Sequence, residues 1–126
     1  MAVTIDDVRR ITAELERSYE VLVRDRVKFR VGRIVYLAFS RDETMMGFAF
    51  PRDERAALVA AEPEKFLLPK PGDMRYQWVV VRLAAIDVDE VRELVESAWE
   101  MVVPKKVSEP YFAARGFSPG AAPPAR

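Results

Sequence analysis

The residues of this chain best suited to chemistry are basic side chains on a predicted hairpin. Lys28 and Arg30 alternate with apolar residues over positions 27–31, so a strand would place both cations on one face, roughly 7 Å apart. That separation is close to the phosphate spacing along one nucleic-acid strand, taken as about twice an axial rise of 3.4 Å. Gly32 permits a tight turn, and Arg33 lies just beyond it. The hairpin could follow a phosphate backbone or enter a groove, or its cations could simply form the solvent face of an edge strand.

A second basic and aromatic group precedes and enters a predicted strand at residues 76–83. Arg75 comes directly before it, and Tyr76 and Trp78 share one of its faces. Exposed rings in such a place could stack nucleobases. Because tryptophan is usually mostly buried, we expect Trp78 to lie in the core instead.

Two further cations, Lys105 and Lys106, follow Pro104. They could contact phosphate. We favour a different role, because cations at the C-terminal end of a helix offset its negative dipole by roughly 0.3–1 kcal/mol.

Catalysis is strongly restricted, because the 126 residues include no histidine and no cysteine. A Ser–His–Asp relay, a thiol nucleophile, a zinc site built on either residue and a disulfide are all excluded. Asp87, Asp89 and Glu90 form an acidic group that lacks the other ligands of a calcium loop, and a helix cap explains it. We therefore expect a non-catalytic protein with no metal and no cofactor.

The charge balance argues against an obligate polyanion binder, because 20 basic and 20 acidic residues give a net charge of zero. The charges are nevertheless unevenly distributed. Residues 21–55 hold eight basic and five acidic side chains, whereas residues 84–103 hold one and six. A dipolar surface with one face attractive to phosphate is expected.

Hydrophobic periodicity predicts the order αβββαββα. The expected elements are a helix from Thr4 to about Arg17, strands at 27–31, 33–40 and 44–50, a helix at 53–62 capped by Asp53, strands at 66–68 and 76–83, and a helix from Asp87 to Pro104. Short turns between strands favour a two-layer α+β fold with a single antiparallel sheet packed by helices.

The chain length fits one domain, which we place at residues 1–108. Residues 109–126 are rich in proline, alanine and glycine and are predicted to be a disordered tail. There is no apolar run of the roughly 20 residues that a membrane-spanning helix needs. The first residues lack the pattern of a signal peptide, so we expect a cytoplasmic protein without membrane contact.

Four stretches in this order resemble the MmcQ/YjbR family. They read TIDDVRRI, KFRVGRIVYLAF, PRDERAALVAAEPEKF and RYQWVVVRLAAIDVDEVRELVESAWEMVVPKK. The resemblance covers residues 3–108 and implies a fold similar to that of secretion chaperones. Members are often labelled DNA-binding on account of two protruding hairpins, a double wing. Here the first wing would be the Lys28–Arg33 hairpin and the second would involve Lys70–Arg75.

This chain departs from the family pattern at two places. Many relatives carry Gly-x-Pro before the first strand, where residues 23–27 read VRDRV. Some relatives also carry histidine and lysine just before the tryptophan, where residues 73–77 read DMRYQ. A site that depends on those residues in relatives is altered here.

The sequence thus predicts a small non-catalytic binding protein, in the first place a weak and sequence-tolerant DNA-binding protein. Its candidate nucleic-acid-binding residues are Lys28, Arg30, Arg33, Lys70, Arg75, Lys105 and Lys106. The alternative is a chaperone-like module that binds a protein or peptide, or a homodimer. The nearly all-apolar stretch at 34–39 and the uneven charge favour this alternative.

Overall fold

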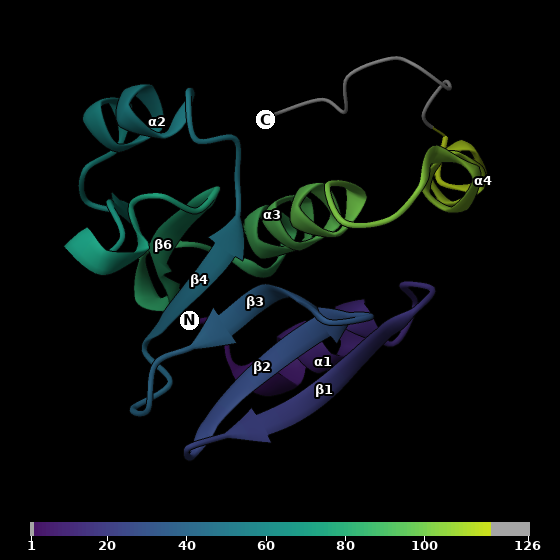
Figure 1. The fold of residues 1–126 in the computed structure, drawn as a ribbon, viewed down its shortest axis with the longest axis horizontal. Coiled ribbons are helices and arrows are strands. Elements are labelled where there is room, and N and C mark those ends of the chain that lie inside the picture. Colours follow the sequence, from purple (N-terminus) through teal and green to yellow (C-terminus); the bar gives the residue numbers. More distant parts are fainter. Residues whose placement is uncertain (1, 117–126) are drawn as a thin grey trace.

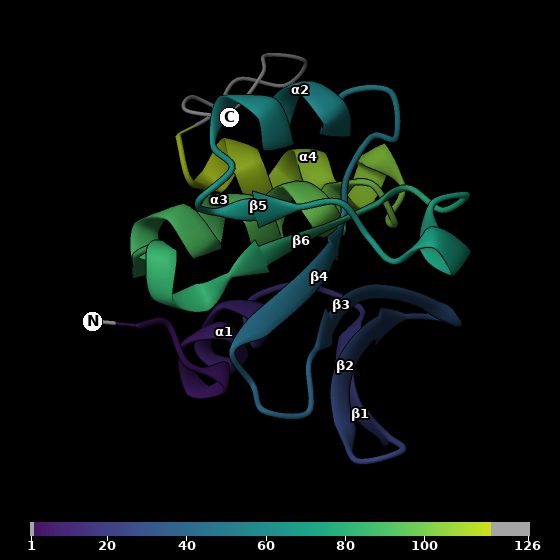
Figure 2. The same ribbon diagram turned by 90° about the vertical axis from the view of Figure 1, so that its left-hand side faces the viewer.

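The computed structural model describes residues 2–116. Within that range the chain forms the following elements, of which Figures 1 and 2 label the α-helices and the strands: α1 (Ile5–Thr12), β1 (Ser18–Val23), β2 (Arg26–Val31), β3 (Ile34–Phe39), β4 (Met45–Ala49), α2 (Arg55–Ala61), β5 (Phe66–Leu67), the 3₁₀ turn η1 (Pro71–Asp73), β6 (Trp78–Arg82), the 3₁₀ turn η2 (Leu83–Ala85), α3 (Val88–Glu100) and α4 (Lys105–Ala114).

One sheet contains all six strands, in the spatial order β1-β2-β3-β4-β6-β5. Every neighbouring pair is antiparallel. The order departs from the sequence only where β6 lies between β4 and β5, so that the connection from β4 to β5, which contains α2, crosses over β6. The predicted α+β class with a single antiparallel sheet packed by helices is confirmed.

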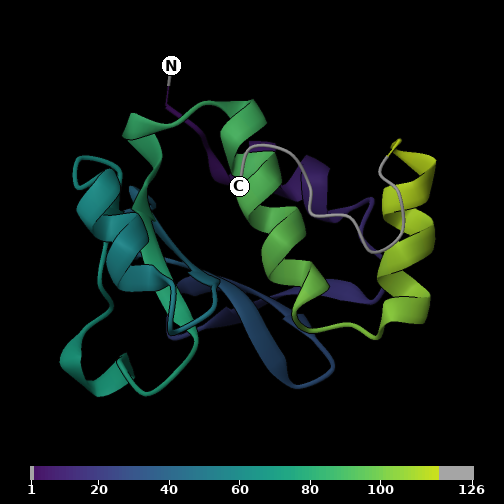
Figure 3. The same ribbon diagram turned by 90° about the horizontal axis from the view of Figure 1, so that it is seen from above.

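The two faces of the sheet carry different side chains. On the face that packs against α1 and α3, paired positions are large and apolar: Leu37 faces Phe48, which in turn faces Val79. Helices α1 and α3 lie together on this side (Figures 1 and 2), and α2 and α4 flank α3 (Figure 3). We call this the covered face and the opposite one the open face.

The helices that cover the sheet begin where the sequence predicts. Thr4 accepts a hydrogen bond from the Asp7 backbone N–H at 3.3 Å, and the Asp7 carboxylate accepts one from the Thr4 N–H at 2.9 Å. This is the expected capping box. Asp87 caps α3 by accepting a hydrogen bond from the Glu90 N–H at 2.8 Å. For α2 the predicted cap is wrong, because Glu54 and not Asp53 precedes the helix and its side chain makes no capping bond.

The strand β1 is absent from the predicted order, which extends the first helix to about Arg17. The helix ends at Thr12 instead, and β1 pairs with β2 along its whole length. The turn between them consists of Arg24 and Asp25, both with positive φ (51° and 65°), as in a type I′ hairpin. Neither residue is glycine or asparagine, so the sequence carried no evident turn signal there.

Helix α4 is the second element missing from the predicted order, and it corrects the expected domain boundary. Residues 109–114, assigned to a disordered tail, belong to this helix despite Pro110 in its interior. Tyr111 and Phe112 pack edge-on against Trp99 of α3, with ring centroids 5.1 and 6.2 Å away. Residues 117–126 of the predicted tail lie outside the described residues.

Trp99 joins these helices to the start of the sheet. Its indole is fully buried, and its Nε1–H donates to the carbonyl oxygen of Glu16 at 2.9 Å. The connection between α1 and β1 is therefore fixed to α3. Within residues 2–116, none of the helices combines the length and apolar composition that crossing a membrane requires.

The packing of α4 predicts that Phe112→Ala lowers the free energy of unfolding by about 3 kcal/mol, since it removes a large buried ring. Lys106→Ala, on the exposed surface of the same helix, should change it by less than about 0.5 kcal/mol. Urea unfolding followed by circular dichroism measures both. Equal and negligible effects would show that this segment is not part of the folded domain.

Candidate nucleic-acid interface

The floor of the open face is made of small side chains. Ala38 of β3 pairs with Gly47 of β4, and Ala49 lies two residues further along β4. Because no helix covers these positions, small residues here leave a depression in the sheet rather than a packed layer.

Trp78 lies across this floor instead of in the core, so the expectation of a buried Trp78 is wrong. A Cβ atom added to Gly47 would lie 2.5 Å from the Trp78 Nε1 and 2.6 Å from its Cε2 and Cζ2 atoms. The indole therefore rests directly on the Gly47 backbone. Trp78 is only half-buried, whereas Val79 beside it in sequence is fully buried on the covered face.

The backbone that carries Trp78 is held by a buried arginine of α2. Arg55 is 6% exposed, and its guanidinium donates to the carbonyl oxygen of Tyr76 at 2.8 Å and to that of Trp78 at 3.4 Å. It also donates to the carbonyl oxygen of Met74. All three bonds fix the segment that enters β6, so Arg55 positions Trp78 without touching the open face.

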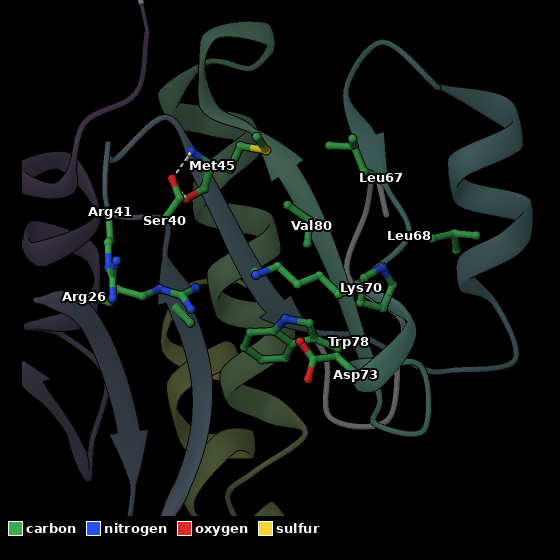
Figure 4. A pocket seen from close by; sticks show the side chains of 13 residues that line it. Arg26, Ser40, Arg41, Met45, Leu67, Leu68, Lys70, Asp73, Trp78 and Val80 are labelled. Atoms are coloured by element: carbon green, nitrogen blue, oxygen red, sulfur yellow. Dashed lines mark hydrogen bonds between the residues drawn. The ribbon is translucent and has the colours of Figure 1, made fainter. Parts of the chain in front are cut away.

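Two hollows flank the indole. The first, which we call the Lys70 hollow, has a volume of about 540 Å³ and is lined by Arg26, Arg41, Lys70, Asp73 and Trp78 over a floor that includes Ala38 and Gly47. Figure 4 shows the Lys70 side chain extending between Val80 and the indole, with its amino group directed toward Arg26 on the opposite side. Asp73 lies beside the indole, on the side away from Arg41.

The second hollow, the Lys28 hollow, has a volume of about 740 Å³. It shares Arg26, Asp73 and Trp78 with the first and adds Lys28 and Arg33. Apolar side chains also line it, among them the exposed Ile34, Tyr76 and Met101. The two hollows are therefore neighbours on one face, with Trp78 as their common wall.

The cations of these hollows are not neutralised by carboxylates. Among residues 2–116, no ion pair includes any of the five basic side chains that line them, Arg26, Lys28, Arg33, Arg41 and Lys70. Outside the hollows, Arg9, Lys65 and Arg92 each pair with two acidic side chains, but others, such as Lys105 and Lys106, also have no ion pair among the described residues. What distinguishes the open face is an excess of positive charge: five basic side chains and a single carboxylate, that of Asp73, line two adjoining hollows, although the whole chain is neutral.

The pKa of Lys28 is lowered in part by this concentration of positive charge. Burial lowers the pKa of its ammonium group below the ordinary value, and three neighbouring guanidinium groups lower that pKa further. They belong to Arg26, Arg30 and Arg24. The carboxylate of Asp73 acts in the opposite direction. A bound anion would relieve the repulsion among these cations.

The structure brings together Lys28, Arg33 and Lys70 of the predicted site residues around Trp78. Arg30 is on the same face of β2 as Lys28, as alternation predicted, but it lines neither hollow. Its Nε atom is buried without a hydrogen-bond partner among the described residues. Arg75 also lines neither hollow, and its guanidinium carbon lies 4.9 Å from the Tyr76 ring centroid.

Lys105 and Lys106 are placed differently from their predicted role. Helix α3 ends at Glu100, so these lysines begin α4 rather than end α3. A helix N-terminus is positive, and the proposed dipole compensation is therefore wrong. Both side chains are exposed, and neither lines a hollow.

The predicted second wing is not a strand hairpin. Residues 70–75 contain the 3₁₀ turn η1 within the connection from β5 to β6. The Lys28–Arg33 segment does turn between strands, at Gly32 with φ of 59° and Arg33. Within residues 2–116, no group of three or more acidic side chains is arranged to hold a metal ion.

Sequence reasoning missed three residues of this region. Arg26 lines both hollows and continues the alternation of Lys28 and Arg30, but the strand was predicted to start one residue after it. Arg41 was assigned only to a turn. Arg55 has no signal in the sequence, because its three acceptors are backbone carbonyls that only the folded chain brings to it.

Comparison with known proteins finds a matching family model, relatives in sequence and a solved structure of similar fold. Residues 12–101 match the family model described as YjbR. The uncharacterized proteins Rv2570 of Mycobacterium tuberculosis and Mb2600 of Mycobacterium bovis are each 32% identical over 132 residues, which cover 90% of this chain and 98% of theirs. The crystal structure of Deinococcus radiodurans protein DR2400, with the family-model domain DUF419, aligns with a TM-score of 0.70 at 19% identity, covering 98% of this chain and 95% of that one.

The contact between Gly47 and Trp78 predicts the effect of a single methyl group. Gly47→Ala should displace the indole, shift its fluorescence and lower the free energy of unfolding by about 1–3 kcal/mol. Gly72→Ala is the matched control, because nothing lies within 4 Å of its Cβ position. Unchanged emission and stability in Gly47→Ala would contradict the placement of the indole.

The charge around Lys28 predicts a pH dependence of stability. Lys28→Gln should raise the melting temperature at pH 7 and low salt, because it removes a partly buried cation that neighbours repel. The native pKa lies below the ordinary value of 10.5, so the wild-type protein gains stability as the pH rises from the native pKa to that value. The advantage of the variant should therefore shrink between pH 7 and about 10. Thermal unfolding at both pH values tests this, and a less stable variant at pH 7 would refute it.

Proposed function

This chain belongs to the YjbR family, and from its open face we propose that it is a small non-catalytic protein that binds single-stranded nucleic acid, DNA in the first place. The uncompensated cations around Trp78 are the observation that carries the proposal. Binding would be weak and sequence-tolerant, and it would use the open face of the sheet instead of two protruding wings.

The cations support contact with a phosphate backbone. Five basic side chains line adjoining hollows, and no carboxylate pairs with them among residues 2–116. They come from β2, the β2–β3 turn, the β3–β4 turn and the segment before η1, so they extend across the sheet. Phosphates would take the place of the missing carboxylates, with affinity that falls as salt rises.

The aromatic residues favour a single strand over a duplex. Trp78 lies flat on Gly47, and Tyr76 is 51% exposed in the adjoining hollow. Stacking on such rings requires bases that are not already stacked and paired, and contributes about 1–3 kcal/mol per base. A base has a π face whatever its identity, which accounts for the proposed tolerance of sequence.

A protein or peptide ligand is the second candidate. Of the eight large apolar side chains that are exposed among residues 2–116, five line the two hollows: Met45 and Leu68 in one, and Ile34, Tyr76 and Met101 in the other. An acidic peptide with apolar side chains would fit the same surface. A homodimer through this face would bury the same residues.

The proposal predicts tighter binding of a single strand of about 12 nucleotides than of a duplex of the same length. If all five cations contact phosphates, log K against log salt should have a slope of about −3.5 for the single strand. Lys28→Gln/Arg33→Gln should weaken binding and reduce the slope by about 1.4. Fluorescence anisotropy from about 50 to 200 mM salt measures these quantities.

Arg10→Gln/Lys106→Gln is the matched control, since it removes the same charge from α1 and α4, outside both hollows. Its binding should stay close to wild type. Equal losses in both double variants would show that binding follows net charge and not the open face. No binding of either nucleic acid at low salt would refute the proposal and favour the peptide or dimer, which gel filtration and acidic peptides would then test.

A further inference from the structure

The Lys70 hollow has the size of a small-molecule site and a strongly basic lining. Its volume of about 540 Å³ lies within the range of roughly 300–1,000 Å³ that is usual for small-molecule sites. Strand floor, loop and indole enclose it on different sides (Figure 4). A space of this volume can hold one compact group.

Three cations from separate parts of the chain converge on it. Arg26 belongs to β2, Arg41 to the turn after β3, and Lys70 to the segment before η1. The Arg26 Nε–H donates to the carbonyl oxygen of Phe39 at 3.0 Å, which fixes the guanidinium and leaves its two Nη groups without a hydrogen-bond partner among the described residues. Such a fork, with two further cations nearby, suits a phosphate group that carries two negative charges.

The remaining wall of the hollow is the Trp78 indole, on which a flat ring can stack. Gly47 supports one side of the Trp78 indole, and the hollow adjoins the half-buried side chain. Asp73 is the only acidic residue in the lining, and it lies beside the indole. Its carboxylate would repel a phosphate there. The phosphate would therefore lie toward Arg41, and an uncharged base would lie against Trp78.

We propose that the Lys70 hollow binds a single nucleoside monophosphate, with the base stacked on Trp78 and the phosphate among Arg26, Arg41 and Lys70. The inference rests on the proposed nucleic-acid function and makes it more specific. Two sources present this chemistry, a free nucleotide and the phosphorylated end of a strand. In either case ring and phosphate are both needed, so binding should require both on one molecule.

Tryptophan fluorescence tests the proposal, because Trp99 is fully buried and Trp78 is not. AMP should quench the emission of the wild-type protein at concentrations at least about tenfold below those needed for adenosine or inorganic phosphate. Lys70→Gln, at an exposed position, should weaken AMP binding by about tenfold while the protein stays folded. Trp78→Phe should abolish the quenching, since only Trp99 then emits.

Two strands, with and without a 5′-phosphate, distinguish the sources. Quenching by AMP would show that the hollow binds free nucleotides as well as the phosphorylated ends of strands. Lys70-dependent preference for the phosphorylated strand, without AMP binding, assigns it to strand ends alone. If AMP has no effect and both strands bind equally in a salt-dependent way, the nucleotide site is refuted while the proposed function stands. If no strand binds either, both are refuted.

Discussion

The alternation of side chains along β4 is the constraint on which both faces of the sheet depend. Met46 and Phe48 are fully buried on the covered face, and Gly47 lies between them on the open one. A shift of the strand by one residue would place glycine in the core and the side chain of Met46 or Phe48 under the Trp78 indole. Core packing therefore fixes the register, and the register fixes where the indole can lie. Fold stability and the open-face hollows are in this sense specified by the same five residues of β4.

The distribution of charged side chains also depends on which residues face the open side of the sheet. On the surface outside the hollows, some basic side chains pair with carboxylates, as Arg9 does with Asp6 and Glu20 at 2.8 and 2.9 Å. On the open face, alternation along β2 places several cations next to one another with few carboxylates nearby. Burial of Lys28 further disfavours its charged form. Such an arrangement opposes folding, so a protein that needed only stability would gain from carboxylates there. A ligand that carries the missing negative charge gives the arrangement a physical reason.

Sequence reasoning could reach what depends on local pattern. The helix caps at Thr4 and Asp87, the α+β class and the shared face of Lys28 and Arg30 all follow from neighbours within a few residues. Sequence reasoning failed where contacts between residues far apart in the sequence determine the local structure. Helix α4 contains Pro110 and lies in a proline- and alanine-rich region, and packing of its aromatic rings on Trp99 outweighs that local signal. Strand β1 turns at Arg24, a residue that gives no indication of positive φ.

The misplacement of Trp78 shows why the site was harder to predict than the fold. Tryptophan in a valine-rich strand has every local reason to be core, and the strand does bury Val79 and Val81. What places the indole on the open face is the alternation relative to those valines, together with a glycine on a neighbouring strand that leaves room for it. Arg55 then holds the entry to β6 through carbonyl groups that any sequence would offer. The position of the ring is thus determined by register and backbone contacts, and the chemistry of the open face depends on that ring.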